Sequence, residues 1–141
     1  MISKHTILYA EDDIDDVFMV KEAFEKHDHI EVVHAFNGWE ALQILNSMHS
    51  NDVLPCLLIL DINMPVMDGK EALAKVRNNQ NLKSVPIVLF STSNSISDQF
   101  FAQQWGVELI TKPLNFNDLE GIAREFVSRC NFEINQLKQS T

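Results

Sequence analysis

Short apolar runs alternate along the chain with segments whose apolar residues recur at helical spacing. Runs of this length are typical of strands buried on both faces. Proline and polar residues flank several of them, and Pro86 directly precedes one. The predicted strands are Ile7–Ala10, Ile30–Phe36, Leu57–Leu60, Ile87–Phe90 and Val107–Ile110.

The segments between and after these runs predict helices, the first with Asp13 as its N-cap. A long helix is expected at the end of the domain. The residues at helical spacing, all apolar except Lys21, are Ile14, Val17, Phe18, Lys21 and Phe24; Trp39, Leu42, Leu45 and Met48; Leu73 and Val76; Ile96, Phe100, Phe101 and Trp105; and Phe116, Leu119, Ile122, Ala123, Phe126 and Cys130.

Strands separated by helix-length segments predict right-handed crossovers and a doubly wound parallel α/β sheet of five strands with helices on both faces. We expect one domain over residues 1–132, and a helix extension or frayed tail over 133–141. In sheets of this kind ligands bind beyond the carboxyl ends of the strands. The residues that directly follow each strand are therefore the candidates for function.

The composition bears on the binding partners, the location and the redox state of the protein. A net charge of −9 argues against a nucleic-acid-binding surface and against binding to anionic membranes. The N-terminus carries no apolar stretch typical of a signal peptide, which favours a cytoplasmic protein. Cys56 and Cys130 show no metal or disulfide pattern, so we expect reduced thiols.

Chemically distinctive side chains follow four of the predicted strands. Glu11 and Asp12 follow the first, Asp61 the third, Ser91 the fourth and Lys112 the fifth. A carboxylate at a buried strand end costs several kcal/mol to desolvate unless a cation or a chemical role compensates. Acids, a hydroxyl and a lysine at one edge of a sheet together indicate a site that accepts a phosphoryl group.

Each of these features has an ordinary structural explanation when it is taken alone. Acids after a strand often cap a helix, and we expect that role for Asp13 and solvated first-turn positions for Asp15 and Asp16. A lysine before a proline is ordinarily an exposed loop residue, and Ser91 opens a polar run. Their joint occurrence at successive strand ends favours the phosphoryl site.

The chain resembles the receiver domains of two-component response regulators over nearly its whole length. The resemblance rests on four motifs in the right order, none of them specific alone. The motifs are Ile7-Leu8-Tyr9-Ala10-Glu11-Asp12-Asp13, Leu60-Asp61-Ile62-Asn63-Met64-Pro65 with Met67-Asp68-Gly69, Pro86-Ile87-Val88-Leu89-Phe90-Ser91, and Thr111-Lys112-Pro113.

This resemblance implies a flavodoxin-like order of strands and assigns the site residue by residue. It implies that Asp61 accepts the phosphoryl group and that Mg²⁺ is held by Glu11, Asp12, Asp61 and the backbone carbonyl of Asn63. Ser91 and Lys112 would each contact a phosphoryl oxygen. Mg²⁺ suits such a site because it prefers oxygen ligands and retains several waters.

The resemblance also implies a function and partners. We expect a stand-alone receiver that is phosphorylated by a sensor histidine kinase or a histidine phosphotransfer protein and then binds a downstream protein target. Similar single-domain regulators serve sensor kinases, including those of the phytochrome type. The signalling face would comprise the helix from Ile96, the strand 107–110 and the final helix, and this face could also form a homodimer.

One position departs from the family pattern, and two others are positions that affect the phosphoryl lifetime in the family. Leu109 stands where the family often has an aromatic residue whose ring swings inward on activation. Asn63 and Ser93 occupy the positions that tune the phosphoryl lifetime in the family. Neither is acidic, and the sequence predicts no rate from them.

Two other functions are weighed against the receiver. A phosphatase of the haloacid dehalogenase type also uses an Asp nucleophile and Mg²⁺, but it requires a second acid where this chain has Asn63, and it usually carries a cap domain. A calcium-binding EF-hand loop is excluded because Pro65 stands at a ligand position and Gly69 is misplaced for the required turn.

Overall fold

Strands and helices alternate from His5 to Gln139. The computed structural model describes residues 4–139, with side chains described through residue 136. The elements are β1 (His5–Ala10), α1 (Ile14–Ala23), β2 (Ile30–Ala35), α2 (Gly38–Ser50), β3 (Leu57–Leu60), α3 (Gly69–Arg77), β4 (Ile87–Ser91), α4 (Ile96–Trp105), β5 (Glu108–Thr111) and α5 (Phe116–Gln139). Each predicted strand is present, with its ends shifted by no more than two residues.

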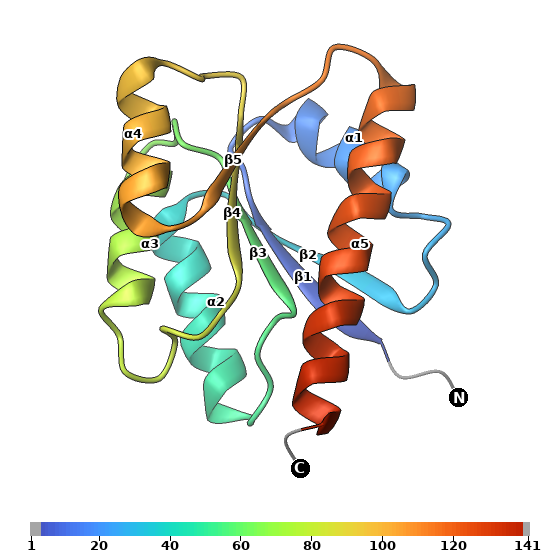
Figure 1. Cartoon of the computed structure of the whole chain (residues 1–141), viewed down its shortest axis with the longest axis vertical. Helices are drawn as coiled ribbons and strands as arrows, with labels where there is room; N and C mark the ends of the chain where they lie inside the picture. Colours follow the sequence, from blue (N-terminus) through green and yellow to red (C-terminus); the bar gives the residue numbers. More distant parts are fainter. Residues whose placement is uncertain (1–3, 140–141) are drawn as a thin grey trace.

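The strands form a single parallel sheet in the order β2-β1-β3-β4-β5. This is the flavodoxin-like order, and it confirms the predicted fold class. The winding direction reverses between β1 and β3, so the connections on the two sides of this point place their helices on opposite faces. In Figure 1, α1 and α5 cover one face of the sheet, whereas α2, α3 and α4 cover the other.

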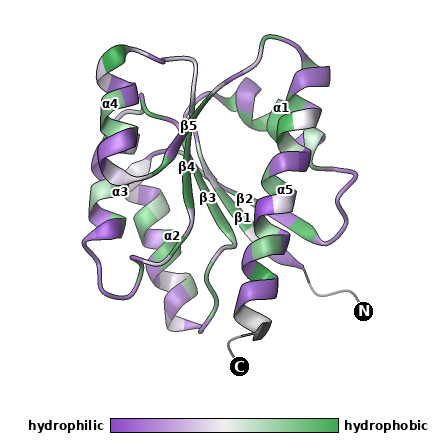
Figure 2. Cartoon of the chain, viewed as in Figure 1, coloured by the Kyte–Doolittle hydropathy of each residue, from purple (hydrophilic) through white to green (hydrophobic). Residues whose placement is uncertain are grey.

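Alternate residues of each strand fill two separate cores. Leu8 and Leu58 pack beneath α2, α3 and α4, whereas Tyr9 and Ile59 pack beneath α1 and α5. β3 and most of β1 are buried on both faces, which explains their continuous apolar sequence. Figure 2 shows these central strands as a hydrophobic layer between helices that carry hydrophilic residues outward.

The large apolar residues of the helices do not all face the cores. Phe18, Trp39, Ile96 and Phe100 are more than half exposed. The sheet is instead contacted largely by small or β-branched residues, such as Val17 and Val20 on α1 or Ala41 on α2. Helical spacing alone therefore does not tell which of the apolar residues on a helix face the sheet.

The two cysteines form a disulfide, which contradicts the predicted reduced thiols. Cys56 directly precedes β3, and Cys130 lies on the face of α5 that covers the same part of the sheet. Their Cα atoms are 4.9 Å apart although 74 positions separate them in the sequence. Sequence spacing carried no sign of this pairing, because α5 returns over β3 only after two further crossovers.

The final helix continues beyond the predicted end of the domain. α5 runs to Gln139, so residues 133–139 are helical, while 140–141 lie outside the described residues. A domain boundary at residue 132 stays a prediction. Within residues 4–139, no helix combines the length and apolarity needed to cross a bilayer.

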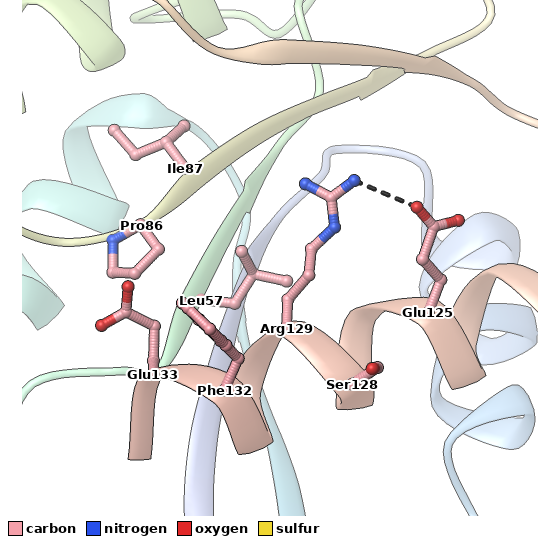
Figure 3. A pocket seen from close by; sticks show the side chains of 8 residues that line it. All are labelled: Leu57, Pro86, Ile87, Glu125, Ser128, Arg129, Phe132 and Glu133. Carbon is pink, nitrogen blue, oxygen red and sulfur yellow. Dashed lines mark hydrogen bonds and ion pairs between the residues drawn. The ribbon is translucent and has the colours of Figure 1, made fainter. Parts of the chain in front are cut away.

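One hollow lies at the edge of the sheet where the strands begin. It is lined by the first residues of β3 and β4 and by α5, and its lining includes Arg129 and Phe132 (Figure 3). The Arg129 guanidinium is paired with Glu108 and Glu125. The acids and the lysine singled out in the sequence lie at the opposite edge.

Candidate phosphoryl-accepting site

The carboxyl edge of the sheet brings the predicted site residues together. Glu11 directly follows β1, Asp61 follows β3 and Lys112 follows β5, while Ser91 is the last residue of β4. Backbone hydrogen bonds continue past the strand ends: Asp61 donates to the Ala10 carbonyl at 3.1 Å, and Lys112 donates to the Ser91 carbonyl at 3.0 Å. These bonds fix the backbones from which the side chains project.

Three carboxylates form a compact group. One oxygen each from Glu11, Asp12 and Asp61 lies within 4.8 Å of the others. Glu11 and Asp61 are buried, whereas Asp12 is exposed, so the group opens to solvent on one side. An open cluster of carboxylate oxygens fits a hard divalent cation that keeps part of its water shell, and the donor set therefore suits Mg²⁺.

Lys112 lies against this carboxylate group. Its ammonium pairs with Glu11, with Asp16 at 2.9 Å and with Asp61 at 3.5 Å. The lysine side chain is only 10% exposed. It is therefore a buried cation held among acids, in contrast to the exposed loop residue that a lysine before a proline usually is.

Because Glu11 and Lys112 are buried next to each other, the pKa values of both groups are shifted from their ordinary values. Burial and the neighbouring Asp61, opposed by Lys112, together raise the pKa of Glu11 to about 7. Burial lowers the pKa of Lys112, but the facing Glu11 and Asp16 carboxylates outweigh this effect and the net pKa is raised. Lys112 thus remains a cation, whereas Glu11 needs a further positive partner besides Lys112 to stay fully ionised near neutral pH.

Tyr9 adds a hydrogen bond beneath the site. Its hydroxyl donates to Glu11 Oε1 at 2.9 Å from within the core. Burial and the adjacent Glu11 charge raise the pKa of Tyr9, so this group stays a donor. The bond holds the Glu11 carboxylate in place beside Asp61.

The turn after Asp61 is held tightly. The Ile62 amide donates to Asp61 Oδ1 at 2.8 Å, and the Gly69 amide donates to the Ile62 carbonyl at 2.8 Å. A Cβ on Gly69 would lie 2.1 Å from the Asp61 carbonyl oxygen, so only glycine fits here. Val66 adopts a φ of 70°, an uncommon conformation for a β-branched residue in a loop next to a functional site. Asn63 is exposed in the same turn, and its role as a carbonyl ligand stays a prediction.

Ser91 is buried at the end of β4, and its Oγ accepts a hydrogen bond from the Ser93 amide at 3.3 Å. This bond uses one acceptor site of Oγ and leaves its hydroxyl proton available to another group. Leu109, which stands where the family often has an aromatic residue, is half-buried against the core beneath α2, α3 and α4. The contacts of Ser91 and Leu109 with a phosphoryl group stay predictions.

Sequence reasoning missed two members of the site. Asp16 pairs with Lys112, although we expected a solvated first-turn acid; its neighbour Asp13 does cap α1, accepting from the Asp15 amide at 2.9 Å. No signal in the sequence distinguished Asp16 from Asp15, the other acid in the first turn of α1. Tyr9 was missed because its place in an apolar run suggested only packing.

Comparison with known proteins agrees with this architecture. The family model of the response regulator receiver domain matches residues 7–124. Response regulator Rcp1 of Synechocystis sp. is 33% identical over 118 residues, which cover 80% of each chain.

Solved structures show the same likeness. The phosphorylated cyanobacterial phytochrome response regulator RcpA is 32% identical with a TM-score of 0.79, over 88% of this chain and 91% of that one. The Mn²⁺-bound form of Rcp1 is 30% identical with a TM-score of 0.77, over 88% and 92%. With the family model covering most of its length and the strand-end acids in place, this chain belongs to the response regulator receiver domain family.

Proposed function

We propose that the protein is phosphorylated on Asp61 in a Mg²⁺-dependent reaction and signals through the resulting change of its surface. The observation that carries this proposal is the convergence of Asp61 with two further carboxylates and the buried Lys112 ammonium at one strand edge. The phosphorylated state of RcpA and the Mn²⁺-bound form of Rcp1 are consistent with it.

The proposed step is an in-line transfer. A carboxylate oxygen of Asp61 forms a bond to phosphorus while the bond from phosphorus to the donor breaks. With a phosphohistidine donor the P–N bond breaks and the imidazole leaves with the electron pair. With acetyl phosphate the P–O bond breaks and acetate leaves.

The surrounding residues have separate roles in this proposal. Mg²⁺, held by Glu11, Asp12, Asp61 and the Asn63 carbonyl, supplies positive charge for the phosphoryl oxygens. Lys112 already lies near Asp61 and can pair with one of these oxygens, and Ser91 can donate its hydroxyl proton to another. The catalytic contribution of the chain is confined to its own phosphorylation and dephosphorylation.

The partners in this proposal are proteins. A sensor histidine kinase or a histidine phosphotransfer protein donates the phosphoryl group, and a kinase of the phytochrome type is the first to test, given the likeness to RcpA. A downstream target, or a second copy of the chain, binds the face formed by α4, β5 and α5. The proposed location is the cytoplasm, and nucleic acid and membranes are not proposed partners because of the acidic surface charge.

Intact-mass spectrometry after incubation with acetyl phosphate and Mg²⁺ tests the central claim. The wild type should gain one phosphoryl group, while Asp61→Asn should gain none, because the amide is not a nucleophile. Circular dichroism of Asp61→Asn serves as the folding control. Undiminished labelling of the folded variant would refute Asp61 as the acceptor.

A further inference from the structure

Asp98 is a buried acid that the proposed chemistry does not use. It lies in the first turn of α4 and is only 6% exposed. One carboxylate oxygen, Oδ1, pairs with the Lys70 ammonium at 2.7 Å. The other, Oδ2, accepts a hydrogen bond from the Ser93 hydroxyl. Lys70 and the Ser93 hydroxyl together lower the pKa of Asp98, so this acid is ionised at neutral pH.

This cluster joins three separate parts of the chain. Lys70 comes from the start of α3, Ser93 from the β4–α4 loop and Asp98 from α4. The Lys70 ammonium also lies 5.4 Å from the centre of the Phe101 ring, which adds a cation–π contact to α4. We call Lys70, Ser93 and Asp98 the α3–α4 clamp.

Both ends of the clamp connect to the candidate site. Lys70 follows Gly69, whose amide is bonded to the Asp61 turn and whose Cα packs against the Asp61 carbonyl. At the other end, the Ser93 amide donates to the Oγ of Ser91. The clamp therefore ties the β4–α4 loop, which follows Ser91, to the turn that carries Asp61.

We propose that the α3–α4 clamp holds Ser91 and the β4–α4 loop in their resting position and thereby limits how readily Asp61 is phosphorylated. In this proposal Ser91 moves toward the phosphoryl group to bond it, and the movement pulls Ser93, whose amide is bonded to Ser91 Oγ, away from Asp98. Asp98 and Lys70 are thus positioning residues that act through Ser93 and Ser91. This inference rests on the proposed phosphorylation of Asp61.

The first test measures the loop without any phosphoryl donor. Hydrogen–deuterium exchange over residues 91–98 should be faster in Lys70→Met than in the wild type, by about five- to tenfold for the loss of a charge-assisted contact. Lys70→Arg should restore the slow exchange because it retains the cation. Lys75→Met removes a charge from an exposed position on the same helix and should match the wild type.

The second test measures the rate of phosphorylation by acetyl phosphate with Mg²⁺. Lys70→Met and Ser93→Ala should each raise the rate severalfold, and their combination should raise it no further because both open one clamp. Lys70→Arg should show the wild-type rate, a rescue that general destabilisation of the fold would not produce.

The outcomes separate the two proposals. If the wild type is phosphorylated and Lys70→Met is phosphorylated at the same rate, the clamp proposal is overturned but the proposed function is not. Unchanged hydrogen–deuterium exchange over residues 91–98 would have the same meaning. A slower rate in Lys70→Met would also overturn the clamp proposal, because the cluster would then assist the reaction. A folded wild type that gains no label from acetyl phosphate or from a kinase would overturn the proposed function, and the clamp with it.

Discussion

At the scale of single residues, the site is defined by how its buried charges are balanced. Glu11 and Asp61 are acids withdrawn from water, and Lys112 is a single cation shared among them and Asp16. Burial and the neighbouring Asp61 carboxylate raise the pKa of Glu11 to about 7, because the single Lys112 ammonium opposes this shift only in part. A divalent cation beside Asp12 would complete the balance.

Mg²⁺ should therefore stabilise the folded protein. By mass action, the free energy of unfolding should rise by about 2.7 kcal/mol at roughly 100 times the dissociation constant. Thermal melts with and without Mg²⁺ measure the gain, and Glu11→Ala with Asp12→Ala should abolish it. If that double variant melted with the wild-type Mg²⁺ shift, the ion would have to bind elsewhere.

Asp98 predicts a second residue-level effect, on the pH dependence of stability. Because Lys70 and Ser93 hold the folded pKa of Asp98 below its usual value, the contribution of the pair is present at neutral pH and is lost as pH falls through that lowered pKa. Lys70→Met should thus cost about 1 kcal/mol of unfolding free energy at pH 7 and less near pH 3.

Urea unfolding of the wild type and Lys70→Met at the two pH values provides the measurement. The titration of the other carboxylates is shared by both proteins and cancels in the difference. An equal deficit at neutral and acidic pH would show that Lys70 stabilises the fold by packing rather than by charge.

At the scale of elements, α4 is notable for the apolar side chains that it leaves uncovered. Ile96 is 85% exposed and Phe100 is 60% exposed, while the helix buries only Asp98 and Ala102. Leu114, in the loop after β5, is fully exposed. Apolar groups on one helix and a nearby loop are typical of a surface that a protein partner covers, which agrees with the proposed signalling face.

Phe100→Lys should weaken self-association or target binding by about tenfold or more, because interfaces depend heavily on buried aromatic residues. Sedimentation of the phosphorylated protein measures the dimer, and pull-down with the identified target measures binding. Phosphorylation by acetyl phosphate should be unchanged in the same variant. Full retention of both assembly and target binding would exclude this part of α4 from the interface.

At the scale of the whole molecule, the disulfide connects the sheet to the last helix. Cys56 and Cys130 link the start of β3 to α5 across 74 positions, at the edge opposite the acids. A cross-link that closes so long a loop restricts the unfolded chain strongly. Both cysteines lie in the core beneath α1 and α5, so the link reinforces packing that is already present.

Reduction of the disulfide should lower the free energy of unfolding by about 2–4 kcal/mol. Denaturant unfolding with and without a thiol reductant measures the loss, and Cys56→Ser with Cys130→Ser should be insensitive to the reductant. Two reactive thiols in the unreduced, denatured wild type would contradict the pairing.

The sequence by itself determined the strands, their parallel arrangement and the residues at the carboxyl edge. Apolar runs such as Leu57–Leu60 have few alternatives to a strand buried on both faces, and the carboxyl ends of parallel strands necessarily meet at one edge. For this reason the positions of Glu11, Asp61, Ser91 and Lys112 along the chain were enough to assign them to one region of the molecule.

Only the tertiary structure decided the contacts between distant segments. The pairing of Asp16 with Lys112 and of Cys56 with Cys130, and the α3–α4 clamp, depend on where crossovers return the chain, which local periodicity does not encode. The exposure of Phe100 was likewise decided by packing, because the size of a side chain does not tell which side of a helix meets the sheet. Local patterns specify elements, whereas the balance of buried charges arises only when those elements assemble.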